Sequence, residues 1–222
     1  MTRHILYMLC FINCWVPMLY AAEPLVPHHA EWQSITKAIR EGKPKTGRDL
    51  LAGIEQYAIE DKHWDEVARA IATRVLLENS DRPADDPQRL IDLDAATKIA
   101  PLQTRGLLQA IQANWTWGFF QANRWRFAQR TTQMKNDADR DLSEISSWDL
   151  LQIVLEIRDQ FEKSLASDAG LKKLFVRDWT MLLENGSLGD AYRPTLWDIV
   201  VRDAIAFHQT GERGLEIGRA HV

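Results

Sequence analysis

Histidine and acidic side chains that could hold a metal ion occur in two short groups. They are His28, His29 and Glu31 near the start of the first expected helix, and His63 between Asp61 and Asp65. Imidazole nitrogens and carboxylate oxygens are common ligands of zinc and other divalent cations. On a helix, however, Asp61 and Asp65 share one face while His63 points elsewhere, and the helix dipole alone favours acidic residues at an N-terminus. We therefore expect no metal site and no cofactor.

Other residue sets that perform catalysis are weakly represented. No Ser lies in the strand-turn-helix context of a nucleophile elbow. The 31 Asp and Glu residues include many pairs of the kind a helical-barrel glycosidase would use, but no pattern singles one out. His208, beside Phe207 near a helix end, is interpreted as structural. Since the only cysteines are Cys10 and Cys14, most of the chain lacks a thiol nucleophile, a disulfide and a Cys-ligated zinc. We predict that the chain is not an enzyme.

Arginine and aromatic residues are interleaved over residues 114–131, within a chain that has nine Trp. This pattern can bind single-stranded nucleic acid through base stacking and charge. A phosphate backbone needs a basic surface, whereas this chain has a net charge of -4 and a pI near 5.9. We therefore expect no nucleic-acid partner.

We interpret the same stretch as a structural knot at the end of a central helix. Trp125 and Phe127 are expected to close the core. Three guanidinium groups would bridge to nearby acids or carbonyls, because this group makes several planar hydrogen bonds and stacks on rings. These cations are Arg124, Arg126 and Arg130, and their candidate partners are Asp149 and Asp198.

The first 22 residues have the layout of a secretory signal peptide. In order, they comprise Arg3 and His4, an apolar stretch over 5–19, and the small residues Ala21 and Ala22. The apolar stretch is shorter than the roughly 20 residues of a transmembrane helix. Because Leu19 or Tyr20 occupies a position that prefers a small residue, an uncleaved anchor is the alternative. We expect export to the periplasm or beyond, with membrane contact only if this segment remains.

Apolar residues recur at helical spacing along the rest of the chain, and no segment alternates with the period of a strand. We predict an all-α fold, either an antiparallel helical bundle or an irregular helical-hairpin array, with about seven helices. The expected helices cover 31–41, a segment from Thr46 to at least Tyr57, about 61–77, about 88–99, 102–122, 148–165, about 171–184, and a segment from Thr195. Expected caps are Thr46 with Asp49, Ser147, and Thr195 with Asp198.

The same pattern divides the chain into parts. A polar stretch over 79–87 separates N-terminal helical hairpins at 23–80 from a main helical subdomain at 81–215. Residues 132–146 are polar and acidic and are expected to form a surface loop. Residues 216–222 look like the translation of a sequencing adapter, with a natural tail as the alternative. The adapter interpretation implies a longer gene product.

Several segments resemble, in the same order, the N-terminal region of large bacterial alpha-2-macroglobulin-like proteins. The segments are Asn114-Trp115 through Phe119-Phe120, Asn123-Arg124-Trp125-Arg126-Phe127, Gln129-Arg130-Thr131, Trp148-Asp149-Leu150 with Phe161 and Ser164-Leu165, and Tyr192-Arg193-Pro194-Thr195-Leu196-Trp197-Asp198. The last is similar to the family's RPTLYD element, with Trp197 in place of Tyr. The opening residues Trp32, Ile35, Ala38, Gly42 and Pro44 also fit. The resemblance covers about residues 31–210.

The resemblance implies an exported protein that traps proteases after they cut a bait segment, in many members with a Cys-x-Glu-Gln thioester. This chain has neither macroglobulin β-sandwich patterns nor a cysteine beyond Cys14, so it is expected to be a leading helical module. Its implied partners are downstream macroglobulin domains of the same polypeptide and, through them, target proteases. The alternative is a free-standing exported helical module that binds other proteins.

Overall fold

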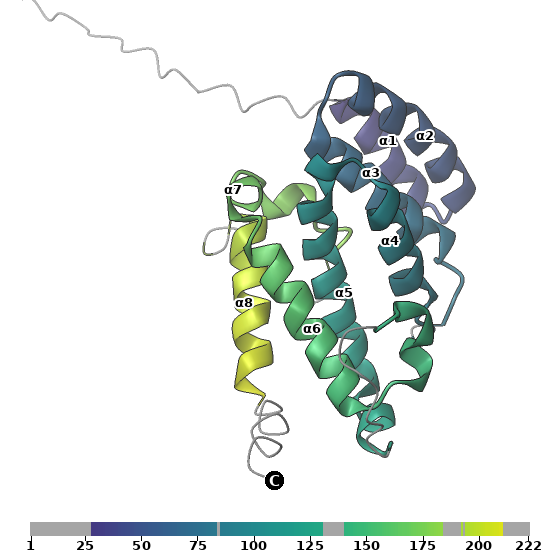
Figure 1. Cartoon of the computed structure of the whole chain (residues 1–222). Helices are drawn as coiled ribbons and strands as arrows, with labels where there is room; N and C mark the ends of the chain where they lie inside the picture. The colour runs from purple at the N-terminus through teal and green to yellow at the C-terminus, as the bar shows by residue number, and fades with distance from the viewer. Residues whose placement is uncertain (1–27, 84, 131–139, 184–191, 193, 211–222) are drawn as a thin grey trace, which may run out of the picture.

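The structure, a computed structural model, describes residues 28–83, 85–130, 140–183, 192 and 194–210 (Figure 1). Over these ranges the chain is helical, apart from connections and one antiparallel bridge between Phe175 and Thr195. The predicted all-α class is confirmed. The elements are α1 (His29–Arg40), α2 (Pro44–Glu60), α3 (Trp64–Glu78), α4 (Gln88–Ile99), α5 (Leu102–Ala128), η1 (Leu142–Ser147), α6 (Leu150–Leu165), α7 (Asp168–Leu171), η2 (Val176–Asp178) and α8 (Leu196–Gln209).

Helix α2 begins earlier than its predicted cap. Pro44 occupies the first turn, where its fixed φ suits a helix and its missing N–H costs nothing, and Lys43 contributes no side-chain cap. The expected cap from Thr46 is therefore wrong. The buried face of α2 comprises Gly47, Leu51, Ile54 and Ala58, whereas Leu50 and Tyr57 are exposed, Tyr57 by 55%.

Helix α5 lies at the centre of the array, as predicted, but it extends beyond residue 122. Its backbone departs from helical geometry at Asn123 (φ -118°, ψ 15°) and then continues to Ala128. The Asn123 amide donates to the Phe119 carbonyl at 2.9 Å. This bond places a side-chain donor at a carbonyl of the preceding turn, which accounts for a kink rather than an end. Ala122, directly before the kink, is exposed.

Two later helices begin with complete capping boxes. Thr195 and Asp198 cap α8 as predicted, with reciprocal bonds between side chains and backbone. At α6 the cap is Asp149, which pairs with Gln152. The prediction of Ser147 as the cap is wrong, because the buried Trp148 has extended backbone and ends η1 instead.

The predicted helix over 171–184 is not formed across 171–183. The Leu196 N–H donates to the Leu174 carbonyl, and the Val176 N–H donates to the Pro194 carbonyl. These bonds tie the segment to the start of α8 instead of to its own i–4 carbonyls. The predicted loop over 132–146 is also wrong at its end, where Leu142 and Ile145 are buried in η1.

Two hydrophobic clusters form the core. A small cluster joins α1, α2 and α3 through Trp32, Ile35, Leu51, Ile54, Ala70 and Leu77. A larger one begins with Ala58 of α2, continues through α3, α4, α5, η1, α6 and α7, and ends with Phe207 of α8. Helix α3 therefore contributes side chains to both clusters. In Figure 1, α1 and α2 lie at one end of the array and α8 at the other, beside α6.

Candidate functional site

The predicted knot at the end of α5 is only partly formed. Phe127 is buried, and its ring lies 5.9 Å from Phe120 and 6.2 Å from Phe119. Trp125 is 63% exposed, so its predicted core position is wrong. Because α5 continues as a helix through both residues, positions two apart point in different directions and cannot both face the core.

Two arginines of the knot, Arg126 and Arg130, contact backbone carbonyl oxygens. Arg130 donates to the Trp148 carbonyl at 2.7 Å, which confirms the expected bridge to a carbonyl. Arg126 lies 3.3 Å from the Asp85 carbonyl and 3.7 Å from its carboxylate, while Arg124 is exposed. The expected pairing of Asp198 with these cations is wrong, because its contacts are those of the α8 cap.

Arg126→Met should leave stability almost unchanged. Its ion-pair partner, Asp85, is well exposed, and exposed pairs contribute about 0–1 kcal/mol. We expect the free energy of unfolding to change by less than about 0.5 kcal/mol in urea titrations. A loss of about 2 kcal/mol or more would instead indicate a buried ionic role for Arg126.

Residues of the two other resembling segments build helix starts. Trp148 is buried, Asp149 and Thr195 are N-caps, and the carbonyl of Pro194 accepts from the Val176 N–H. Arg193 lies outside the described residues. The structure thus gives framework roles to Trp148, Asp149, Pro194 and Thr195. None of these contacts brings acids or nucleophiles into one pocket.

The histidines near the N-terminus lead to an acid that the sequence interpretation missed. His28 Nδ1 lies 2.9 Å from Glu66 Oε2, and the Trp32 indole donates to Glu66 Oε1 at 2.8 Å. Glu66 is only 3% exposed. It shares the inward face of α3 with Ala70, Thr73 and Leu77. An acidic residue at an inward-facing position of the helical pattern was therefore the feature of the sequence that could have identified Glu66. Within the described ranges, no group of three His, Cys, Asp or Glu residues could hold a metal ion.

The His28–Glu66 contact should make stability depend on pH. The hydrogen bond to Glu66 raises the pKa of His28 above 6.5, with Glu31 and Asp61 acting in the same direction. Protonated His28 thus favours the folded state, and its contribution is complete below pH 6.5 and lost as pH rises through the raised pKa. We expect His28→Gln to reduce this decline of the free energy of unfolding with rising pH, as measured by urea titrations below and above the raised pKa of His28. His63→Gln, which changes an exposed histidine, should retain it.

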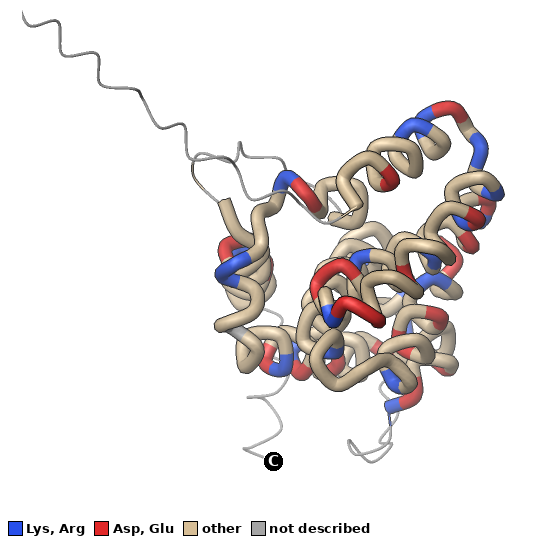
Figure 2. Tube along the Cα trace, turned by 90° about the horizontal axis from the view of Figure 1, so that it is seen from above, with Lys and Arg blue, Asp and Glu red and all other residues tan. Residues whose placement is uncertain are grey.

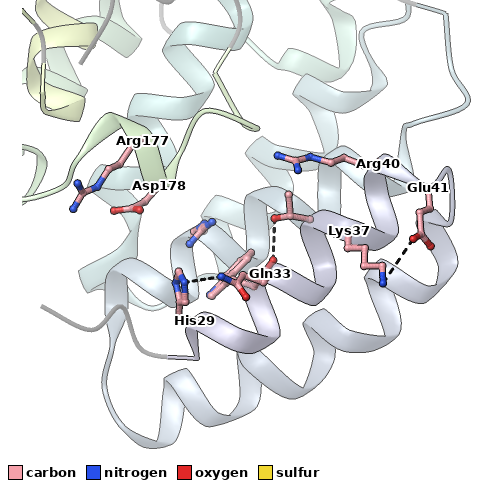
Figure 3. A pocket seen from close by; sticks show the side chains of 10 residues that line it. His29, Gln33, Lys37, Arg40, Glu41, Arg177 and Asp178 are labelled. Atoms are coloured by element: carbon pink, nitrogen blue, oxygen red, sulfur yellow. Dashed lines mark hydrogen bonds and ion pairs between the residues drawn. The ribbon is translucent and has the colours of Figure 1, made fainter. Parts of the chain in front are cut away.

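A groove lined by several cations lies between α1 and η2. Its volume is about 560 Å³. Lys37 and Arg40 line it from α1, Arg69 from α3, and Arg177 with Asp178 from η2. Figure 3 shows Arg177 and Asp178 across from the α1 side chains. Elsewhere, basic and acidic residues are interspersed along the helices (Figure 2).

The guanidinium carbon of Arg69 lies over the Trp32 ring, 3.8 Å from the ring centroid. Trp32 is buried, so the cation covers an aromatic floor. In the part of the chain that the structure describes, the guanidinium has no hydrogen bond or ion pair. Burial lowers the pKa of Arg69, partly offset by the charges of Asp178, Glu66 and Asp65. The groove therefore holds a partly desolvated cation with free donors.

A second surface is the outward face of α8. Tyr192, Trp197, Val201 and Ile205 line a shallow hollow of about 480 Å³. Ile205 is 52% exposed and Tyr192 is mostly exposed. This α8 stripe shares no residue with the groove.

None of the helices within the described ranges is both long enough and apolar enough to cross a membrane. Comparisons with protein-family models, with curated proteins and with solved structures find no match to this chain.

Proposed function

We propose that this chain is the N-terminal helical module of an exported alpha-2-macroglobulin-like protease trap, and that it performs no catalysis itself. The α8 stripe is the observation that carries the proposal. Exposed apolar side chains that adjoin on one surface are typical of an interaction site. The exposed side chains of Tyr192 and Ile205 would pack against the macroglobulin domains that follow in the same polypeptide.

The positions of the resembling residues support this reading. Asp149 and Thr195 cap helices, and Trp148 fills the core. Residues with these roles preserve a shape rather than a reaction. A module that holds the following domains in place needs such a framework, whereas the bait segment and any thioester would belong to those domains.

The reading frame provides the first test. We expect the native locus to continue past Leu215 into domains with the alternating pattern of β-strands and an exposed bait segment. A native stop codon after Val222 would contradict the proposal. Reproducible turnover by the purified chain in a broad hydrolase screen would contradict its non-enzymatic part.

Cysteine labelling tests the docking face directly, because the chain has only Cys10 and Cys14. With both changed to Ser, Ile205→Cys introduces the sole thiol of this chain. We expect rapid reaction with a maleimide in the 222-residue chain and strong protection in the longer protein. Ile99→Cys, at a side chain that is 87% exposed, is the matched control and should react in both. Equal labelling of residue 205 in both proteins would show that the α8 stripe is not covered.

A free-standing exported helical module that binds other proteins is the second candidate. The groove between α1 and η2 favours it, since a free cationic hollow suits a separate ligand. A stop codon in the native frame together with a reproducible soluble partner would support this candidate over the first.

A further inference from the structure

Basic side chains outnumber acidic ones along the lining of the groove. Four cations, Lys37, Arg40, Arg69 and Arg177, line it together with two acids, Glu41 and Asp178. Glu41 is already engaged, because its Oε2 lies 2.7 Å from Lys43 Nζ and its Oε1 lies 4.0 Å from Lys37 Nζ. Burial lowers the pKa of Arg69, and the charge of Asp178 only partly opposes this effect. The two side chains form no ion pair with each other.

Two of these cations have donors available to a ligand. Within the described ranges, Arg40 and Arg69 have no hydrogen bond or ion pair through their side chains. The guanidinium carbon of Arg69 lies 3.8 Å from the centroid of the Trp32 ring, and this cation–π contact restricts the guanidinium group before any ligand arrives. Arg40 follows Lys37 by three residues in the last turn of α1, and such positions are neighbours on a helix surface. A preorganised guanidinium loses less freedom when it binds a carboxylate in a bidentate manner.

We propose that this groove binds an acidic peptide segment of a partner protein, with Arg40 and Arg69 each receiving a carboxylate. Lys37 and Arg177 would supply further attraction from the two sides, and Asp178 would set the spacing by repelling a carboxylate placed beside it. The site does not depend on the proposed function, since the groove and the α8 stripe share no residue.

Charge and shape favour a peptide over other anions. A nucleic acid would need a basic track longer than one groove, whereas acidic residues are interspersed with basic ones along the helices (Figure 2). A small metabolite is usually enclosed among apolar walls, whereas Figure 3 shows polar side chains along the groove, from His29 to Glu41. Its 560 Å³ is enough for a few side chains of an extended segment.

Fluorescence anisotropy with a labelled peptide of alternating Glu and Gly tests the site. We expect saturable binding that weakens as salt is raised, and at least tenfold weaker binding of the matching Gln–Gly peptide. Arg40→Gln should weaken binding of the Glu peptide about tenfold, as expected when one charge-assisted contact is lost. Arg48→Gln, on the exposed side of α2, is the matched control and should bind like the parent protein.

Arg69→Gln should abolish detectable binding, with circular dichroism reporting whether the fold is retained. Arg40 is exposed, so Arg40→Gln should fold like the parent protein. If Arg69→Gln does not fold, the Arg40→Gln variant still tests the site. Equal binding of the Glu and Gln peptides would overturn the proposal. So would equal losses from Arg40→Gln and Arg48→Gln, or full competition by free glutamate or phosphate at the concentration of the peptide.

Discussion

Trp115→Ala should lower the free energy of unfolding by about 3–5 kcal/mol, the range for large buried aromatic residues. Trp115 is fully buried at the centre of α5. Its indole donates to the Leu182 carbonyl, and the Arg89 guanidinium carbon lies 4.6 Å from its ring centroid. Removing the ring leaves a cavity and also an unpaired carbonyl in the segment before α8. Urea titration followed by circular dichroism measures the loss.

Trp125→Ala is the matched control, because it removes the same side chain from an exposed site on the same helix. We expect a change below about 0.5 kcal/mol. If Trp115→Ala does not fold, Trp115→Phe keeps most of the ring and should cost about 1–2 kcal/mol. Equal losses at positions 115 and 125 would contradict the assignment of core and surface on α5.

Asp203→Ala should cost about 2–3 kcal/mol, because it breaks a buried polar contact between α5 and α8. Asp203 Oδ2 accepts from the Asn114 amide at 2.8 Å, and Oδ1 accepts from Arg202 at 2.7 Å. Both Asn114 and Asp203 are buried, so water cannot replace the lost carboxylate without entering the core. The loss is measured in the same urea titration.

Two comparisons isolate the Asp203 contact. Glu60→Ala removes an exposed acid with a single hydrogen bond from Gln56 and should be close to neutral. A double-mutant cycle with Asn114→Ala should show positive coupling of about 1 kcal/mol or more between positions 114 and 203. Additive losses would mean that the two side chains act independently.

The sequence could predict features that depend on a few neighbouring residues. Helix α4 and the capping box of Thr195 with Asp198 are two examples, because both follow from local propensity and short-range hydrogen bonds. The central position of α5 followed from its broad apolar stripe. The prediction of Trp125 as a core residue failed because it considered residue type without following the helical phase past Asn123.

Features that join distant segments could not be predicted in this way. The region after Leu171 has helical periodicity, but its backbone pairs instead with residues 194–196. The groove brings α1 next to Asp178, and no period in the sequence relates such distant positions. The contact of Glu66 with α1 is the exception, because an acid at an inward-facing position of α3 can be recognised from the sequence pattern alone.

The sharing of α3 between the two clusters has a consequence for how the molecule opens. Helices α1 and α2 rest on one side of α3, while the main core covers its other side. Detachment of the α1–α2 pair would expose the small cluster and, at Ala58 of α2, part of the main core. Loss of the main core would also remove the support of α1 and α2. Local opening free energies of this kind appear in amide hydrogen exchange. Since one wall of the groove belongs to α1, each such opening would dismantle it, and a bound ligand would slow exchange throughout α1 and α2.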